Sequence, residues 1–304
     1  MTGTPSRPIV IAHRGASGHR PEHTLEAYRV AIEMGADVIE PDLVATKDGV
    51  LVARHENEIG ATTDAAARFP DRKAAHTVDG HAVPGWFVED LTLAEIKTLR
   101  ARERLPFRSH DYDGAFEVPT FDEVLELVAR QSAARGRAIG VYPETKHPSY
   151  FRALGLALEP RLLDALARRG WTHASDPVFV QSFESGSLEI LRRETRVRLV
   201  QLLETAPSDE DLARIARYAD GIGPDKRLVV PFDAAAGALA RPTDLVRRAH
   251  AAGLFVHVWT MRSDARFLAP DYGGDPAKEY REFASLGVDG IFTDFPDAAV
   301  GALR

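Results

Sequence analysis

The chain has 304 residues, no cysteine and a formal net charge of −7. The acidic balance argues against a general surface for polyanions, so we expect no nucleic-acid partner. Disulfide bonds are excluded, and the 44% of hydrophobic residues can bury a large core. This length fits one large α/β domain or two ordinary ones, and barrels commonly fill it as one domain.

The N-terminal sequence carries no targeting pattern. Residues 1–7 lack the apolar core of a signal peptide, and no apolar run of the chain is long enough to span a bilayer. We therefore expect no stable membrane insertion and a cytoplasmic protein. If Met1 replaces a natural leader, a periplasmic or secreted protein is expected instead.

The first structured stretch is predicted to be a strand followed by a helix. The apolar run Val10–Ala12 is typical of a buried strand, and this strand ends at His13 and Arg14. Thr24 is a suitable N-cap for the helix, and Gly35 is expected to end it.

A second strand begins at Val38. Side chains alternate along a strand, so Glu40 and Asp42 are expected on the same face. Pro41, which lies between them, is unusual in an inner strand because it donates no hydrogen bond to a neighbour. After a turn, a further extended run leads to His55.

Residues 56–119 interrupt this alternation. They contain polar turns, a capping box at Thr92 that predicts a helix to about Leu99, and a basic run over residues 100–108. A long segment of this kind is either functional or a structural embellishment, and the sequence leaves both open. Because the segment starts directly after His55, we expect it to cover part of a catalytic mouth.

Strands and helices alternate again from Pro119 onward. Helices are expected at 120–135, 158–169, 186–193, 208–218, 242–252 and 277–286, and strands at 138–142, 178–183, 198–203, 221–223, 255–259 and 290–292. Together with the first two strands this gives eight strands, of which the sixth has the weakest pattern. The alternation predicts a TIM (β/α)8 barrel. We expect a single domain over 1–304, with 56–119 as a subdomain inserted after the second strand.

The barrel interpretation brings polar groups together, because active sites of this fold lie at the C-terminal strand ends. Glu144 and Lys146 end the third strand, Phe183 the fourth and Trp259 the seventh. They should share one mouth with the polar residues that end the first two strands.

Three carboxylates, Glu40, Asp42 and Glu144, are expected in this mouth. An oxygen-only cluster suits a hard cation, Ca²⁺ or Mg²⁺. The alternative is that the carboxylates only form ion pairs with Arg14 and Lys146.

His13 and His55 are candidates for a general acid and base, because histidine changes charge near neutral pH. Arg14 and Lys146 could offset the charge of a phosphodiester. Phe183 and Trp259 are either core residues or an apolar wall of the site. We expect the other histidines to be surface or structural residues, and among them only His23 lies close to the motif.

Several motifs carry a resemblance to a known family. They are His13-Arg14-Gly15, Pro21-Glu22-His23-Thr24, Glu40-Pro41-Asp42, His55, Tyr142–Lys146 and Gly290–Asp297. In this order they resemble the glycerophosphodiester phosphodiesterase family, most closely its long calcium-dependent bacterial form. Pro41 and Glu56, which stands where the family usually has Asp, depart from the pattern.

The resemblance implies a TIM barrel with Glu40, Asp42 and Glu144 as metal ligands and His13 and His55 as the acid–base pair. It implies cleavage of a small glycerophosphodiester into sn-glycerol 3-phosphate and an alcohol. The alternatives are a lysophospholipase D and a non-catalytic binding protein on the same barrel. The oligomeric state, the headgroup and the order of proton transfers stay open.

Overall fold

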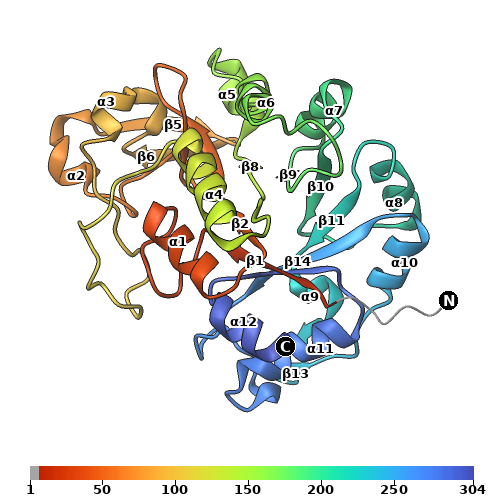
Figure 1. Ribbon diagram of the computed structural model, residues 1–304. Coiled ribbons are helices and arrows are strands. Elements are labelled where there is room, and N and C mark those ends of the chain that lie inside the picture. Colours follow the sequence, from red (N-terminus) through yellow and green to blue (C-terminus); the bar gives the residue numbers. More distant parts are fainter. Residues whose placement is uncertain (1–6) are drawn as a thin grey trace.

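The computed structural model describes residues 7–304. Within this range, eight positions of parallel strands form a closed barrel (Figure 1). Six positions hold one strand each: β1 (Ile9–His13), β9 (Phe179–Ser182), β10 (Arg198–Leu203), β11 (Gly221–Pro224), β14 (Phe255–Met261) and β15 (Gly290–Thr293). The barrel closes because β1 pairs with both β15 and β2. The predicted fold and its weak sixth strand, β11, are confirmed.

The second and third positions are each divided into two short strands. The second consists of β2 (Val38–Glu40) and β3 (Asp42–Ala45), which are separated by Pro41. The third consists of β7 (Gly140–Val141) and β8 (Glu144–Thr145). β2 pairs with β7 and β3 pairs with β8, so the parallel order continues across the break. The interruption removes the conflict between a proline and an inner strand.

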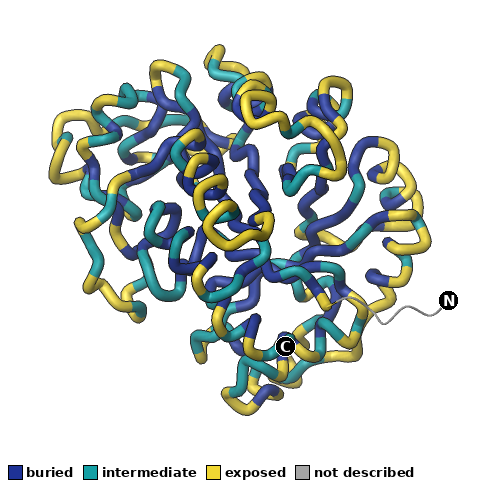
Figure 2. The backbone as a smooth tube through the Cα atoms, viewed as in Figure 1, coloured by how far each residue is buried: buried dark blue, intermediate teal, exposed yellow. Residues whose placement is uncertain are grey.

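Helices surround the strands, and their buried faces pack against the barrel (Figures 1 and 2). They are α1 (Leu25–Glu33), α4 (Phe121–Arg135), α5 (Pro148–Ala153), α6 (Leu158–Arg168), α7 (Ser185–Glu194), α8 (Asp209–Ile215), α9 (Lys226–Val229), α10 (Leu245–Ala251), α11 (Pro276–Ser285) and α12 (Pro296–Leu303). Thr24 caps α1 as predicted, because its hydroxyl accepts a hydrogen bond from the Ala27 amide. The helix α5 was not predicted from the sequence.

Residues 56–119 lie together at one side of the barrel, drawn in orange and yellow in Figure 1. Their elements are α2 (Ala65–Arg68), η1 (Pro70–Arg72), β5 (Ala74–Val78), β6 (His81–Gly85), η2 (Val88–Asp90) and α3 (Leu93–Ile96). The capping box at Thr92 is present, but α3 ends at Ile96, earlier than predicted. The antiparallel pair β5–β6 was not predicted.

Three further short elements and one antiparallel strand complete the description. β4 (Leu51–Ala53) pairs antiparallel with β3 and leads to His55. The others are β12 (Phe232–Asp233), β13 (Ala238–Leu239) and η3 (Pro270–Tyr272). Among residues 7–304, no helix combines the length and the apolarity that a membrane crossing requires.

The core has two apolar layers. The larger lies between the strands and the helices. The smaller fills the barrel interior and contains Ile11, Val38, Tyr142, Phe179, Val200 and Phe292. The interior is therefore packed, and the open space of the barrel is confined to its C-terminal mouth.

Candidate active site

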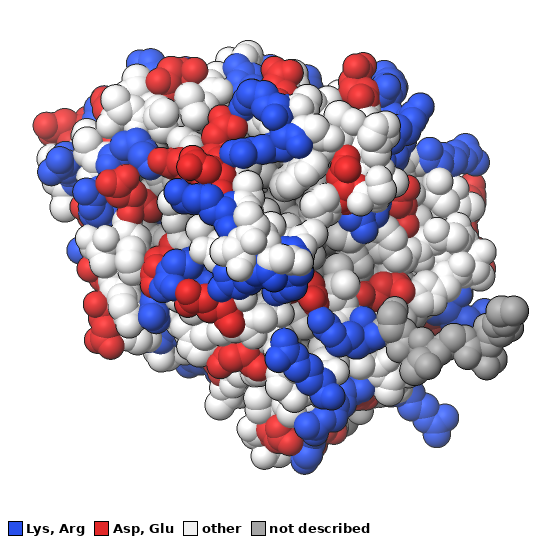
Figure 3. Space-filling model, viewed as in Figure 1, with Lys and Arg blue, Asp and Glu red and all other residues white. Residues whose placement is uncertain are grey.

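A cavity of about 260 Å³ opens at the C-terminal ends of the barrel strands. All nine residues predicted for the site line it: His13, Arg14, Glu40, Asp42, His55, Glu144, Lys146, Phe183 and Trp259. The sequence separates these residues by up to 246 positions (259 − 13), and the barrel topology brings them to one mouth. Charged groups of both signs also intermingle on the molecular face drawn in Figure 3.

The turn between β1 and α1 explains the His-Arg-Gly order. Arg14 has a positive φ of 59°, which is costly for a residue with a side chain. This conformation accompanies a hydrogen bond of 2.8 Å from the Arg14 amide to Glu40 Oε2. Gly15 follows with φ of 87°, and a Cβ there would lie 2.7 Å from the carbonyl carbon of Ala27. Only glycine satisfies both requirements.

Glu40, Asp42 and Glu144 form a compact and buried cluster. One oxygen of each carboxylate lies within 4.8 Å of the others. Burial and the negative charges of its neighbours raise the pKa of Glu40 well above its ordinary value. Burial likewise raises the pKa of Glu144 to about 8. Burial would also raise the pKa of Asp42, but Lys146 and a hydrogen bond from His23 hold it well below its ordinary value.

The cluster has the properties of a site for a hard cation. Three carboxylates supply oxygen ligands, and a cation would relieve their mutual repulsion. Asp42 Oδ1 is buried without a hydrogen-bond partner among the described residues. A buried carboxylate oxygen without a partner is costly, and coordination of a metal ion would satisfy it. The residues present therefore fit a metal ion.

His13 and His55 have matching surroundings. His13 Nδ1 lies 2.6 Å from Asp294 Oδ1, and His55 Nδ1 lies 2.9 Å from Glu56 Oε1. Burial and the positive charge of Arg14 lower the pKa of His13 to about 3. Burial, Arg14 and Lys146 lower the pKa of His55 to about 4. Both imidazoles are thus neutral near pH 7, with Nδ1 directed to a carboxylate.

Arg14 and Lys146 combine the two roles considered for them. Arg14 Nη1 donates to Glu22 Oε2 at 3.0 Å, and its Nε lies 3.5 Å from Asp42 Oδ2. Lys146 Nζ lies 2.9 Å from Glu144 Oε1. Ion pairing with the carboxylates is therefore real, but both side chains also line the cavity. They can contribute to the binding of an anion without leaving their partners.

Phe183 and Trp259 form an aromatic wall. Their ring centroids are 5.8 Å apart in an edge-to-face arrangement. Trp259 Nε1 donates to the Gly223 carbonyl at 2.6 Å, which fixes the indole, whereas Phe183 is 41% exposed. They are wall residues rather than interior core residues.

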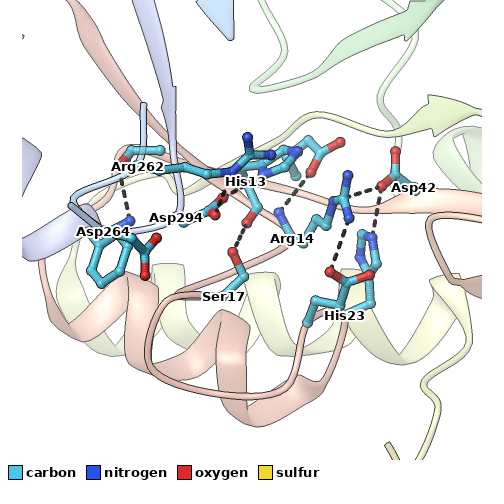
Figure 4. A network of polar contacts seen from close by, with 12 residues as sticks. His13, Arg14, Ser17, His23, Asp42, Arg262, Asp264 and Asp294 are labelled. Atoms are coloured by element: carbon cyan, nitrogen blue, oxygen red, sulfur yellow. Dashed lines mark hydrogen bonds and ion pairs between the residues drawn. The ribbon is translucent and has the colours of Figure 1, made fainter. Parts of the chain in front are cut away.

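Sequence reasoning missed the residues that orient the site. His23 is fully buried, and its Nε2 lies 2.8 Å from Asp42 Oδ2 (Figure 4). Its Nδ1 lies 2.8 Å from the Tyr28 hydroxyl. Glu22 holds Arg14, and Asp294 holds His13. The quoted motifs already contained His23, Glu22 and Asp294, so their membership in the motifs was a usable signal.

The inserted segment contributes little to the walls of the cavity. Of the described residues 56–119, only Glu56 lines the cavity. The aromatic wall of the cavity comes from the barrel itself, from Phe183 directly after β9 and Trp259 within β14. The expectation that the segment covers part of the mouth is therefore supported only at Glu56, its first residue.

Fold and site together define a TIM-barrel enzyme with carboxylates that can hold a metal ion at its mouth. The model of the glycerophosphoryl diester phosphodiesterase family matches residues 13–298, and the chain belongs to this family. A glycerophosphodiester phosphodiesterase of Arabidopsis thaliana is 38% identical over 95% of this chain and 84% of its own.

Solved structures agree with the fold. The crystal structure of a glycerophosphodiester phosphodiesterase from Agrobacterium tumefaciens has a TM-score of 0.64 and 25% identity, covering 97% of this chain and 99% of that one. A phosphodiesterase of Oleispira antarctica, solved in complex with the product sn-glycerol-3-phosphate, has a TM-score of 0.67 and 22% identity. It covers 97% of this chain and 96% of its own.

Proposed function

We propose that this protein hydrolyses small glycerophosphodiesters to sn-glycerol 3-phosphate and an alcohol in a metal-dependent reaction. The observation that carries the proposal is the single cavity in which two carboxylate-bound histidines lie with the cluster of Glu40, Asp42 and Glu144. The names of the relatives support the same substrate class.

His13 and His55 act as the acid–base pair in this proposal. The P–O bond to the alcohol breaks while a new P–O bond forms to the nucleophile, either water or the neighbouring glycerol hydroxyl. In the second case a cyclic phosphate forms first, and water then opens it to sn-glycerol 3-phosphate. One histidine accepts the proton of the nucleophile at Nε2, since Nδ1 of each is directed to a carboxylate. The other donates a proton to the leaving alkoxide. The negative charge of a bound diester would offset Arg14 and Lys146 and favour a protonated histidine.

Glu40, Asp42 and Glu144 would hold the metal, and we propose Ca²⁺ with Mg²⁺ as the alternative. Ca²⁺ binds six to eight oxygen ligands in a flexible geometry. Three protein carboxylates would therefore leave coordination positions for substrate and water. When bound, the ion would polarise a phosphate oxygen as a Lewis acid. Arg14 and Lys146 would bind the diester charge beside it.

The aromatic wall would contact the glycerol carbons, and we propose that Phe183 and Trp259 bind this end of the substrate. A pocket that hydrogen-bonds glycerol hydroxyls rejects a diester without them, because its polar groups would stay unpaired.

We further propose one domain over 1–304, with 56–119 as an inserted subdomain. The two ends of this segment lie close together, because the amide of Ala53, shortly before it, donates to the carbonyl of its last residue, Pro119, at 3.0 Å.

The test is an assay of the purified protein on glycerophosphocholine, glycerophosphoethanolamine and glycerophosphoglycerol, with chelator and with added metal. We expect similar kcat/KM for the three, loss of activity with chelator and recovery with Ca²⁺ or Mg²⁺. Full turnover in excess chelator, with no metal in the purified protein, would contradict the metal proposal.

Two further substrates separate the alternatives. Bis(p-nitrophenyl) phosphate and lysophosphatidylcholine should be poor substrates, because the first lacks glycerol hydroxyls and the second needs a long apolar groove. A clear preference for the lysolipid would instead favour a lysophospholipase D. Binding without turnover of any diester would favour a non-catalytic protein.

A further inference from the structure

Arg108, from the basic run of the inserted segment, contacts the carboxylate that holds His13. Its Nη2 donates to Asp294 Oδ2 at 2.6 Å and to Asp264 Oδ2 at 2.7 Å. Its Nη1 donates to the Ser17 carbonyl at 3.1 Å. The other oxygen of Asp294 lies 2.6 Å from His13 Nδ1. Figure 4 shows Asp294 beside His13, with Ser17 and Asp264 in the same region.

A second arginine of the same run makes an analogous contact. Arg104 Nε donates to Glu22 Oε2 at 3.0 Å, and the same oxygen accepts from Arg14 Nη1 at 3.0 Å. Asp294 thus contacts His13 and Glu22 contacts Arg14, and each of these two carboxylates is bound by one arginine from residues 104–108. The repeated arrangement indicates that this part of the segment supports the motif.

Burial makes the Arg108 contact consequential. The Arg108 side chain is 6% exposed, and it lies between two carboxylates that are 4% and 13% exposed. Removal of the guanidinium would leave two buried negative charges close together without their shared partner. Arg262 Nε also lies 3.0 Å from Asp294 Oδ2, but its side chain is 25% exposed. Among the described residues, Arg262 makes no ion pair with Asp264.

We propose that Arg108 is a positioning residue for the phosphodiesterase reaction. It fixes Asp294, and Asp294 fixes the His13 ring by accepting a hydrogen bond from its Nδ1–H, which leaves Nε2 available for proton transfer. The inference rests on the proposed function of His13. It gives residues 104–108 a role in the chemistry although this part of the segment does not line the cavity.

Kinetics test the inference with a matched control from the same run. Arg108→Ala should lower kcat on glycerophosphocholine by roughly 10–100-fold, which is the range observed when a residue that holds a functional side chain in place is removed. KM should change less than about threefold. Arg102→Ala should leave both constants unchanged, since Arg102 is exposed. An unchanged kcat in Arg108→Ala would overturn the inference. Arg108→Gln, which keeps amide donors but no charge, replaces the alanine variant if that variant does not fold.

A double-mutant cycle shows whether Arg108 acts through Asp294. In an Asp294→Asn background, adding Arg108→Ala should lower kcat by less than about twofold, because the route to His13 is already broken. A loss of the same factor in both backgrounds would mean that Arg108 acts by another route, and would overturn the inference.

A measurement without substrate separates this inference from the proposed function. In protein labelled with ¹⁵N at histidine, the Nδ1 proton of His13 should give a downfield NMR signal, assigned by its loss in His13→Gln. The signal should persist in Arg102→Ala and shift or disappear in Arg108→Ala. An unchanged signal in Arg108→Ala would overturn the inference, whether or not the wild-type protein hydrolyses any glycerophosphodiester.

Discussion

His13 and His55 come from different strand ends, yet each has the same local arrangement. Each ring directs Nδ1 to a carboxylate, Asp294 for His13 and Glu56 for His55. A carboxylate on Nδ1 fixes the tautomer and the ring orientation, so that Nε2 is the atom available for proton exchange. The departure at Glu56 therefore keeps a carboxylate beside His55 and preserves this chemistry.

Replacement of either histidine tests their roles. His13→Ala and His55→Ala should each lower turnover by roughly 10²–10⁴-fold, the usual contribution of a general acid or base. The double variant should lose far less than the product of the two factors, because the pair acts as a unit. The measurement is kcat on glycerophosphocholine, with the exposed His81→Ala as control. Near-native turnover in one variant would remove that residue from the mechanism.

His23 has a different effect, because it contacts a proposed metal ligand rather than the cavity. Without its hydrogen bond to Asp42, the carboxylate is less well oriented, and outer partners of this kind contribute 10–100-fold to metal affinity. His23→Ala should therefore raise the metal concentration for half-maximal activity by roughly that factor, with kcat recovered at saturating metal. Tyr28→Phe removes the hydroxyl beside His23 Nδ1 but keeps His23 and its contact with Asp42. This variant should raise the required metal concentration less than His23→Ala. Equal metal dependence in wild type and His23→Ala would contradict this role.

At the scale of elements, the sequence predicted regular units better than interrupted ones. The strand β1, the helix α1 and its Thr24 cap were predicted from local patterns that the structure confirms. The split of β2 and β3 at Pro41 depends on pairing with β7 and β8 across the barrel, which no local pattern contains. The nine proposed site residues were predictable because strand ends of one barrel converge. The motifs contained His23, Glu22 and Asp294, but which group each of them holds depends on side-chain contacts that the sequence does not show.

The β1–α1 turn makes a prediction about stability. Gly15→Ala should destabilise the fold more than Gly170→Ala, although both glycines have positive φ values of 87° and 73°. Both variants place a side chain on a residue with left-handed backbone conformation, which costs about 1–2 kcal/mol. Only the new Cβ at position 15 meets backbone, at 2.7 Å from Ala27, whereas nothing lies within 4 Å at position 170. Urea unfolding measures the difference. Equal losses of unfolding free energy would show that the turn relaxes around the Cβ.

At the scale of the whole molecule, buried ionisable groups couple stability to pH in opposite directions. Burial lowers the pKa of His257 to about 3, so the unfolded state binds more protons than the folded state below about pH 6.5, and acid destabilises the fold. His13 and His55 contribute in the same direction. Glu144 acts oppositely, because its pKa of about 8 lets the folded state bind the additional proton between about pH 4.5 and 8.

His257 isolates one of these contributions, because it lies in the barrel interior, 3% exposed, with Nδ1 3.0 Å from the Tyr142 hydroxyl. His257→Gln should be less stable than wild type at pH 7 by about 1–3 kcal/mol, since it disturbs a buried hydrogen bond. Below pH 6.5 the wild type alone carries the cost of excluding a proton from this site. The difference in unfolding free energy between wild type and His257→Gln should therefore narrow by up to about 1.4 kcal/mol for each pH unit below 6.5.

Urea unfolding of wild type and His257→Gln at about pH 7, 6 and 5 measures this narrowing, since the slope of stability with pH reports the difference in bound protons. His81→Gln is the control for the same replacement at an exposed position. Contributions from His13, His55 and Glu144 cancel, because they are common to all three proteins. If the difference between wild type and His257→Gln does not change with pH, His257 is either protonated in the folded state or reached by water.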